Sequence, residues 1–570
     1  MLHRATMLRE LLVVTGLFVA CAPTAPAGQN PASGQVAAPQ AAAISQKQMV
    51  IAFATEPQML EPSFGQGSGN RDFSALTSGF LTYLTPQQQA MPYLAQELPS
   101  LDRGTWKVLP DGRMETTYTL RRNLTWHDGH ALTAHDFVFG HTMHLDPAMP
   151  AAKIDVDRRI GRVQALDDYT IFLDWKEPYL WAGMIFEPNF PALPRHILED
   201  LYNNDKQAFV DSAHWRTEFI GTGPYKLEGW QQGVDMTLLA FDGFALGKPP
   251  IDKIVMRFIA DANTIVANLL TGTVDVAFHS SIAFSENQGL EQRGWAGHVE
   301  YWRGNPRWLE FQTRDWGNIQ KAVLDARVRR ALVHAIDRRA IVDGLYSGKT
   351  QVQYYWLSAD DPAYQAVDRA VPKYEYDVRQ AEILLQEAGW IKGSDGVARN
   401  TAGDSLSIPI LNQSGDIDQL EAAILVDFWK AIGASGEIQR LSRAQQADGE
   451  FRSKYQAVTY NRRPLGYDTM GWLSSNVTTA ENRWGGDNMS GYHNPTLDQL
   501  WPRVLATIDA KDREPLLINA LTAMTNDAVI NPTHLQPRSM VYRSGITGPQ
   551  EPWVGESALI WNAWEWRWTQ

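Results

Sequence analysis

The sequence predicts a globular protein of mixed α/β class. Stretches with the alternation of strands and stretches with the periodicity of helices are interspersed along the chain, and no short-period repeat indicates a solenoid or a propeller. The 570 residues are 44% hydrophobic and 20% charged, which is the composition of an ordinary folded protein. Because a single hydrophobic core stops growing well before this length, we expect more than one domain.

The first 46 residues are expected to lie outside the folded body. The apolar run Leu11–Ala20 is too short to span a bilayer as a helix, so residues 1–20 are interpreted as a signal peptide. The run ends in FVAC, which places Ala20 directly before Cys21, the single cysteine of the chain. This resembles the bacterial lipobox, with Phe18 where leucine is usual, and implies cleavage before Cys21 and lipidation of its thiol. An ordinary signal followed by a chance cysteine is the alternative.

Residues 21–46 are interpreted as a lipidated cysteine followed by a flexible tether. The segment after the cysteine is rich in alanine, proline, glycine and serine and nearly uncharged, so it cannot form a core. Several acyl chains on one residue would anchor the protein stably to a membrane. The expected location is therefore outside the cytoplasmic membrane, on its periplasmic side where the cell has two membranes.

Order is expected to begin at Met49–Pro57, an apolar run rich in β-formers and closed by proline. Further strands are predicted at Met114–Leu120, Tyr169–Trp175, Ile254–Ile259 and Trp308–Thr313. The tail Trp561–Gln570 alternates tryptophans with charged residues, which predicts a last strand with one aromatic face.

Two segments show the periodicity of amphipathic helices. Asp325–Gly348 carries one apolar face, and Gly348 is expected to stop it. Asp377–Trp390 is the second, with Gly389 as its C-terminal stop.

The stretch Asn123–Asp146 holds five of the thirteen histidines and three aspartates, which raises the question of a metal site. Locally it predicts a strand end, a tight turn at Asp128-Gly129, and a helix with Thr133 as N-cap and Asp136 completing a capping box. A helical metal site favours two imidazoles at positions i and i+4, and no such pair occurs here. We therefore expect solvated surface histidines and no metal.

The same stretch resembles the signature of family 5 extracellular solute-binding proteins, which serve ABC importers. The pattern LR-x-x-x-x-W-x-DG-x-P-x-TA-x-DF is met except that Ala131 replaces the usual proline, and none of the five histidines belongs to it. Other elements that resemble the family follow in its order: EPQMLEPSF (56–64), PYLAQELP (92–99), ALPRHIL (192–198), IGTGPYKLEGW (220–230), LGKPPIDKI (246–254), LLTGTVDVA (269–277), the helical 325–348 segment, YDVRQAEILLQEAGW (376–390) and SGYHNPTLDQL (490–500).

The resemblance implies a two-lobed, class II periplasmic-binding-protein fold with an additional small domain and a discontinuous first lobe. The implied limits are 47–82, 219–303 and 536–570 for lobe I, 83–218 for the extra domain and 304–535 for lobe II. It also implies that the lobes close on a solute and that the permease and ATPase of an importer recognise the closed form. We expect a monomer that captures peptides; a nickel complex, an opine or an oligosaccharide is the alternative.

The resemblance further implies candidate ligand-binding residues in the segment TYNRRPLGYDTMGWLSSN (459–476). Asp468 is the carboxylate expected to hold a peptide ammonium, and a solvated loop acid is its alternative. Trp472 is expected to wall the pocket. Arg462 and Arg463 are candidates for a ligand carboxylate, because guanidinium pairs with it bidentately.

Three more candidates lie elsewhere. Trp302 and Asn305, in YWRGNPRWLEF, are expected where the chain crosses between the lobes. Tyr225 follows the GTGPY string, and structural packing is the preferred interpretation of it over ligand contact.

Composition excludes some other functions. The net charge of −13 argues against a nucleic-acid partner, because neutralising phosphates requires clustered basic residues. A secreted hydrolase needs a nucleophile with a base, or paired carboxylates in one cleft. No GxSxG or HExxH string occurs, and the only cysteine is assigned to the anchor. We therefore expect neither enzymatic activity nor a cofactor. The 21 tryptophans suit ligand-lined clefts as well as cores.

Overall fold

The computed structural model describes residues 47–60, 68–149, 155–186, 189–462, 471–555 and 558–569. The predicted signal peptide, Cys21 and the predicted tether lie outside the described residues, as do Arg463 and Asp468.

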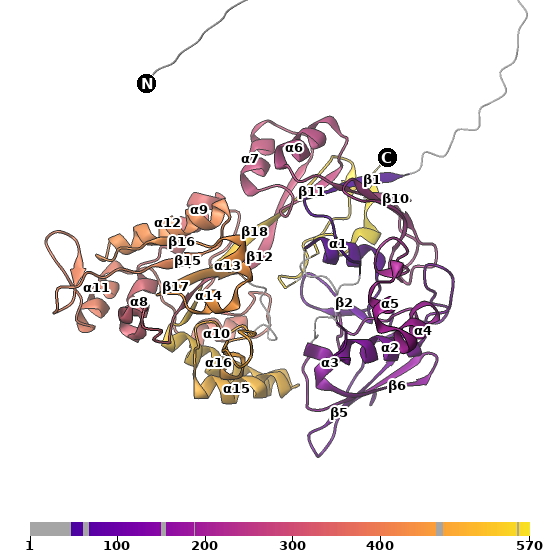
Figure 1. The fold of residues 1–570 in the computed structure, drawn as a ribbon, viewed down its shortest axis with the longest axis horizontal. Helices are drawn as coiled ribbons and strands as arrows, with labels where there is room; N and C mark the ends of the chain where they lie inside the picture. Colours follow the sequence, from indigo (N-terminus) through magenta and orange to yellow (C-terminus); the bar gives the residue numbers. More distant parts are fainter. Residues whose placement is uncertain are drawn as a thin grey trace, which may run out of the picture. The chain divides into compact units, whose positions relative to one another are not determined.

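A ten-stranded mixed sheet dominates the described part of the chain (Figure 1). β1 lies near its middle and pairs in parallel with β10, from Gln48 opposite Lys253 to Phe53 opposite Phe258. The sheet order is β16 (Ile438–Arg440), β15 (Ile410–Asn412), β17 (Val458–Arg462), β12 (His298–Phe311), β18 (Ile530–Tyr542), β11 (Val276–Phe278), β1 (Gln48–Phe53), β10 (Lys253–Phe258), β9 (Asp235–Ala240), β8 (Tyr225–Gln231).

A second, antiparallel sheet has the order β4 (Trp106–Val108), β5 (Met114–Thr119), β7 (Thr170–Trp175), β6 (Ile160–Asp167). Residues of β5 alternate between buried and half-buried, because helix α2 (Ala134–Leu145) and its surroundings cover one face. The predicted capping box at the start of α2 is confirmed: Asp136 accepts a hydrogen bond from the Thr133 amide at 2.8 Å. The short pairs are β2 (Thr82–Leu84) with β3 (Ala90–Pro92), β13 (Ile391–Lys392) with β14 (Ala398–Arg399), and β19 (Ile546–Thr547) with β20 (Arg567–Trp568).

The remaining helices flank these sheets. They are α1 (Ser68–Thr77), α3 (Asp155–Arg159), α4 (Arg195–Asn204), α5 (Lys206–Val210), α6 (Ala262–Thr271), α7 (Phe284–Gln292), α8 (Ala326–His334), α9 (Arg338–Tyr346), α10 (Tyr364–Ala370), α11 (Val378–Glu387), α12 (Asp416–Lys430), α13 (Arg443–Ala447), α14 (Gly449–Ser453), α15 (Pro495–Ala506) and α16 (Ala510–Asp527).

The predicted strands correspond to β1, β5, β7, β10 and β12, although β12 begins at His298 rather than at Trp308. The predicted single helix over 325–348 is wrong, because the chain breaks after His334 and a second helix, α9, begins at Arg338. Asp337 caps the new helix by accepting the Ala340 amide at 2.9 Å. The stop is close to the predicted place, since Ser347 and Gly348 both have positive φ.

The predicted tail strand is also wrong over most of its length. Residues Ala563–Glu565 form a 3₁₀ turn, and only Arg567–Trp568 pair as β20. The Asn562 side chain fixes the turn, because its amide donates to Gly548 O at 2.8 Å and its oxygen accepts from Trp566 Nε1 at 2.9 Å. Trp564 and Trp566 consequently enter two different hydrophobic clusters instead of one aromatic face.

The histidine-rich stretch is more buried than its sequence predicts. His130 and His135 are exposed as expected, but His127, His141 and His144 are buried, so the prediction of solvated histidines is wrong for these three. The physical reason for the last two is Asp157. Its carboxylate bonds Nδ1 of His141 at 2.9 Å and Nδ1 of His144 at 3.1 Å, so both rings are buried with a partner.

Within the described ranges, no helix combines the length and the apolar character that crossing a bilayer requires.

Candidate ligand-binding region at the crossing strands

Two long strands, β12 and β18, pair with each other in the middle of the ten-stranded sheet, and each has a second partner over only one end of its length. β12 pairs with β17 through Arg307–Phe311, whereas β18 pairs with β11 through Met540–Tyr542. The register between β12 and β18 shifts between Arg303 and Pro306. Such bulges interrupt the ladder and bend the strand, and proline removes one ladder donor. The regular pairing is therefore weakest where the chain passes between the two halves of the sheet.

Gly304 lies at this shift and permits a close approach of the two strands. A Cβ placed on Gly304 would lie 2.2 Å from the backbone oxygen of Gln536 on β18. Since real Cβ atoms do not approach an oxygen so closely, the crossing geometry depends on glycine at this position.

Arg303, at the same shift, ties the crossing to two distant segments. Its Nη1 donates to Asp360 at 2.6 Å, and its Nε donates to Glu551 at 3.1 Å. Glu551 also accepts the Arg303 amide at 2.7 Å. Although partial burial lowers the pKa of Arg303, the two carboxylates outweigh it and raise that pKa overall.

Directly after the shift, β12 is anchored by a buried charged network. Arg307 is fully buried, with Nη2 at 2.9 Å from Asp418 and at 2.5 Å from Glu421. His534 on β18 lies 2.9 Å from the same glutamate. Burial alone would raise the pKa of Glu421, but Arg307 and the hydrogen bond from His534 hold it at about 2. The glutamate therefore stays ionised, and this half of both strands is fixed to α12.

Three of the predicted site residues are gathered near this half of β12. Asn305 lies within the register shift and is half-buried. Arg462 ends β17 opposite Arg307, is exposed, and reaches Gln536 Oε1 with Nη1 at 3.4 Å. Trp472 is only 1% exposed and belongs to a tryptophan group with Trp308 and Trp356, with ring centroids 5.9 and 4.4 Å away.

The other described candidates lie apart from these. Trp302 is 8% exposed and packs on the opposite side of the shift, in the cluster that contains β1 and β10 residues. Tyr225 has no exposed surface and begins β8, the strand at the far edge of the sheet. Its burial in that cluster is the packing role that the sequence favours.

Sequence reasoning missed an aromatic group formed by Tyr83, Phe186, Trp553, Trp561 and Trp564. The Phe186 and Trp553 rings meet edge to face at 5.5 Å, and Tyr83 meets Trp564 at 5.6 Å. All but Trp553 line a small pocket of about 40 Å³. Its lining is mostly aromatic and apolar. The signal in the sequence was the density of tryptophan near the C-terminus.

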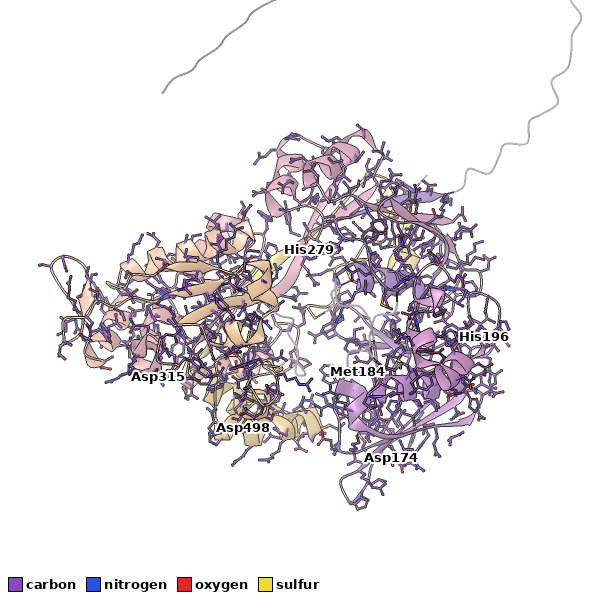
Figure 2. The ribbon with its side chains drawn as sticks, in the orientation of Figure 1. Asp174, Met184, His196, His279, Asp315 and Asp498 are labelled. Atoms are coloured by element: carbon purple, nitrogen blue, oxygen red, sulfur yellow. The ribbon has the colours of Figure 1, made fainter. Side chains whose placement is uncertain are left out.

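The segment that leads to Phe186 also contacts the half of the structure that contains α15. The amide of Leu180 donates to the carbonyl of Leu505 at 2.9 Å, at the end of α15. The Leu180 side chain is buried in a hydrophobic cluster that contains Trp501 of α15. In return, Ile508, just after α15, packs against the hydrophobic core of the four-stranded sheet. Figure 2 labels Met184, which lies in this segment, and Asp498, which lies on α15. The two halves are therefore joined at a second place besides the crossing strands.

Comparison with known proteins decides the family. The sequence model of bacterial extracellular solute-binding proteins, family 5 (middle region), matches residues 97–484, which is more than half of the chain. The chain belongs to this family. It is 28% identical to Protein XP55 of Streptomyces lividans over 455 residues, which cover 79% of this chain and 76% of that protein.

Two solved structures show the fold of this family 5 protein. One is the oligopeptide-binding protein of Thermus thermophilus complexed with a pentapeptide, with a TM-score of 0.71, 22% identity, and coverage of 92% of this chain and 96% of that chain. The other is NikZ of Campylobacter jejuni in complex with Ni(L-His), with a TM-score of 0.72, 22% identity, and coverage of 92% and 100%. The predicted fold class is confirmed: a two-lobed α/β binding-protein fold with an additional small domain and a discontinuous first lobe.

Family membership also bears on chemistry and location. The family consists of extracellular solute-binding proteins, so this member is a binding protein rather than an enzyme and acts outside the cytoplasm. The predicted ligand-binding residues stay predictions. Two of them, Arg463 and Asp468, lie outside the described residues.

Proposed function

We propose that this family 5 protein is the substrate-binding component of an ABC importer, that it captures peptides between two closing lobes, and that it delivers them to the permease. The observation that carries this proposal is the weakened crossing of β12 and β18, which is flanked by a buried charged anchor on one side and a hydrophobic core on the other. A pair of strands with interrupted pairing between two rigid bodies is suited to absorb the rotation of a hinge.

The proposed limits of the domains follow from the same crossing. Lobe I comprises residues 47–82, 219–303 and 536–570, the extra domain comprises 83–218, and lobe II comprises 304–535. β12 gains β17 as a second partner from Arg307 onward, and β18 gains β11 from Met540 onward, which supports the two inner limits.

Peptides are the proposed cargo because an extended backbone can complete strand-like hydrogen bonds beside the crossing strands while aromatic walls accept varied side chains. The structural likeness to an oligopeptide-binding protein holding a pentapeptide supports this choice. Asp468 is proposed to hold the peptide ammonium, and Arg462 with Arg463 the peptide carboxylate. Asn305 and Trp472 are proposed to border the ligand, with Trp302 as packing near it. Tyr225, which begins the strand at the far edge of the sheet, is proposed to pack in the core of lobe I.

The remaining parts of the proposal concern attachment and assembly. Lipidation of Cys21 and a tether over residues 22–46 would hold a monomer at the outer face of the cytoplasmic membrane, within reach of the permease. Labelling of growing cells with a fatty-acid analogue tests this, because Cys21→Ser should abolish incorporation of label into the protein.

Native mass spectrometry of freshly purified, tag-free protein tests the cargo. A ladder of bound masses that fragment as peptides is the expected result. A single mass that corresponds to a nickel chelate, an opine or a glycan would contradict the peptide assignment and leave the binding role intact. Chemical turnover of the bound compound would contradict the binding role itself.

Replacement of the proposed ammonium-binding carboxylate gives a sharper test. Asp468→Asn should weaken binding of a free-amine peptide by tenfold or more, because a hydrogen bond to a charged group contributes about 1.5–3 kcal/mol. The N-acetylated form of the same peptide should lose little, and titration calorimetry measures both. Glu481→Gln, a change at an exposed acid thirteen residues later in the sequence, is the control. Equal losses for the two peptides would remove Asp468 from this role.

A further inference from the structure

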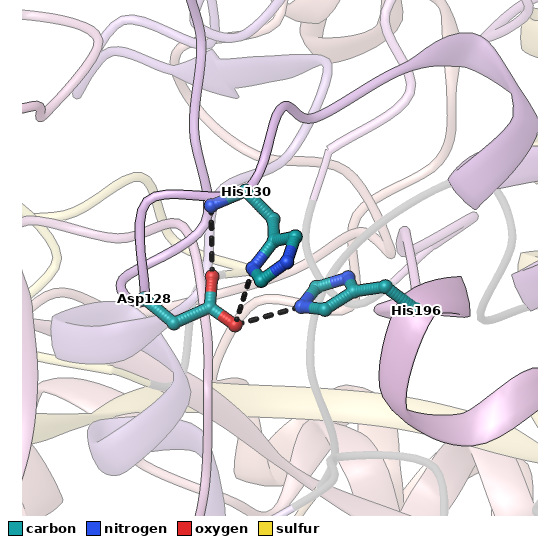
Figure 3. A group of neighbouring side chains, drawn as sticks. All are labelled: Asp128, His130 and His196. Atoms are coloured by element: carbon teal, nitrogen blue, oxygen red, sulfur yellow. Dashed lines mark hydrogen bonds and ion pairs between the residues drawn. The ribbon is translucent and has the colours of Figure 1, made fainter.

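A group of three potential metal ligands lies in the region proposed as the extra domain, apart from the crossing strands. Asp128 and His130 belong to the tight turn before α2, and His196 belongs to the first turn of α4. Asp128 Oδ2 lies 3.1 Å from Nδ1 of His130 and 2.7 Å from Nε2 of His196. The three ligand atoms lie within 4.8 Å of one another, and Figure 3 shows both rings turned toward the one carboxylate oxygen.

The local structure holds these side chains in place before any ligand arrives. The turn is closed by the Trp126 amide, which donates to His130 O at 2.8 Å, and Gly129 provides the positive φ of +92°. The His130 amide donates to Asp128 Oδ1 at 3.0 Å, which leaves Oδ2 directed at the two rings. The rings of His130 and His196 are stacked with centroids 4.1 Å apart.

The start of α4 is fixed relative to the same turn. Asp136, which completes the capping box of α2, accepts a hydrogen bond from the Arg195 amide at 3.2 Å, so His196 is held next to the turn by its neighbour. Two of the potential ligands therefore lie on a hydrogen-bonded turn, and the third lies at the start of a helix that is fixed relative to that turn. Such a site needs little rearrangement when an ion binds.

The chemistry of the donor set indicates which ion would bind. Two imidazole nitrogens and one carboxylate oxygen are ligands of Zn²⁺, Ni²⁺ and Cu²⁺, whereas Mg²⁺ and Ca²⁺ prefer oxygen ligands. The side chain of His130 is 63% exposed, so water has access to the remaining coordination positions. We propose that Asp128, His130 and His196 bind one divalent transition-metal ion, of the Zn²⁺ or Ni²⁺ type, on the surface of the extra domain and independently of the transported solute.

The test uses the metal ions alone and tag-free, lipid-free protein. Titration calorimetry with ZnCl₂ and NiCl₂ should show one saturable ion per chain. His130→Ala and His196→Gln should each weaken binding by about tenfold or more, the scale seen when the ligand environment of a metal is damaged. His135→Ala is the matched control, because His135 is an exposed histidine that lies 3.7 Å from a single carboxylate, that of Asp168.

A spectroscopic readout separates ligation from indirect effects on the fold. The electron paramagnetic resonance spectrum of bound Cu²⁺ should show coupling to two nitrogens in the natural protein and to one in His130→Ala, whose thermal unfolding should be unchanged. No saturable binding, or equal binding by His130→Ala and His135→Ala, would overturn the proposal. The affinity for the metal ion should be the same with and without a peptide in the cleft, because the proposed metal site is separate from the proposed cargo site.

Discussion

At the scale of single residues, His127 shows how the family signature is tied to the rest of the fold. Its Nδ1 accepts the Gly221 amide and its Nε2 donates to Gly223 O, both at 3.1 Å, so the ring joins the signature turn to the GTGPY loop in a neutral form. Burial lowers the pKa of His127 to about 4, against a weaker opposite effect of its bond to Gly223.

This depressed pKa makes stability depend on pH. In the unfolded chain His127 titrates near pH 6.5, so between pH 6.5 and about 4 the unfolded state binds a proton that the folded state does not. The free energy of unfolding should therefore fall as pH falls through this window, by about 2 kcal/mol between pH 7 and pH 5 from this residue alone. Urea unfolding at the two pH values should show a correspondingly smaller fall for His127→Gln, whose amide can keep both hydrogen bonds. Equal falls in both proteins would contradict the assignment.

The histidines also show which residue-level features the sequence could predict. The capping box at Thr133 and Asp136 was predictable, because both partners lie within one turn of the chain. The burial of His141 and His144 depends on Asp157, and the cluster at Asp128 depends on His196, 68 residues away. Such pairings are tertiary, and local spacing carries no information about them.

At the scale of elements, the crossing strands combine a feature that the sequence predicts with one that it does not. Apolar alternation predicts the second half of β12. The strand nevertheless begins earlier, at His298, because β18 is available there as a pairing partner. The break between α8 and α9 was hidden because the apolar periodicity continues across it while Asp337 provides a new N-cap. The sequence therefore predicts the existence of helices and strands better than it predicts where they begin and end, because tertiary contacts determine these limits.

Gly304 is the residue on which the crossing depends. Gly304→Ala should lower the free energy of unfolding by about 1–3 kcal/mol, the usual cost of overpacking, because its Cβ would meet Gln536 O. Urea unfolding measures this, with Gly229→Ala on β8 as the control, since a Cβ there would meet nothing within 4 Å. If Gly304→Ala and Gly229→Ala lower the free energy of unfolding equally, β12 and β18 can move apart at Gly304 without loss of stability.

At the scale of the whole folded body, the crossing strands and the contact around Leu180 are two of the places at which the two halves are held together. The second contact lies at the C-terminal end of α15, with Leu180 on one side and Ile508 on the other. A rotation about the crossing strands would separate these surfaces, so their burial favours the conformation seen here. Burying a leucine side chain contributes about 1.5–3 kcal/mol, and each 1.4 kcal/mol changes an equilibrium tenfold.

Leu180→Asp should therefore shift the unliganded protein toward an open form by at least about tenfold, because it removes apolar contact and places a charge beside Trp501 and Leu505. Small-angle scattering should show a larger radius of gyration for the variant than for the natural protein, and a bound solute should reduce the difference. The affinity for that solute should also fall, by at most the same factor, since binding energy is then used to restore the closed form. Leu166→Asp is the control, because Leu166 is 59% exposed on β6 of the same region. If both variants scatter alike, the contact at Leu180 does not restrain the lobes.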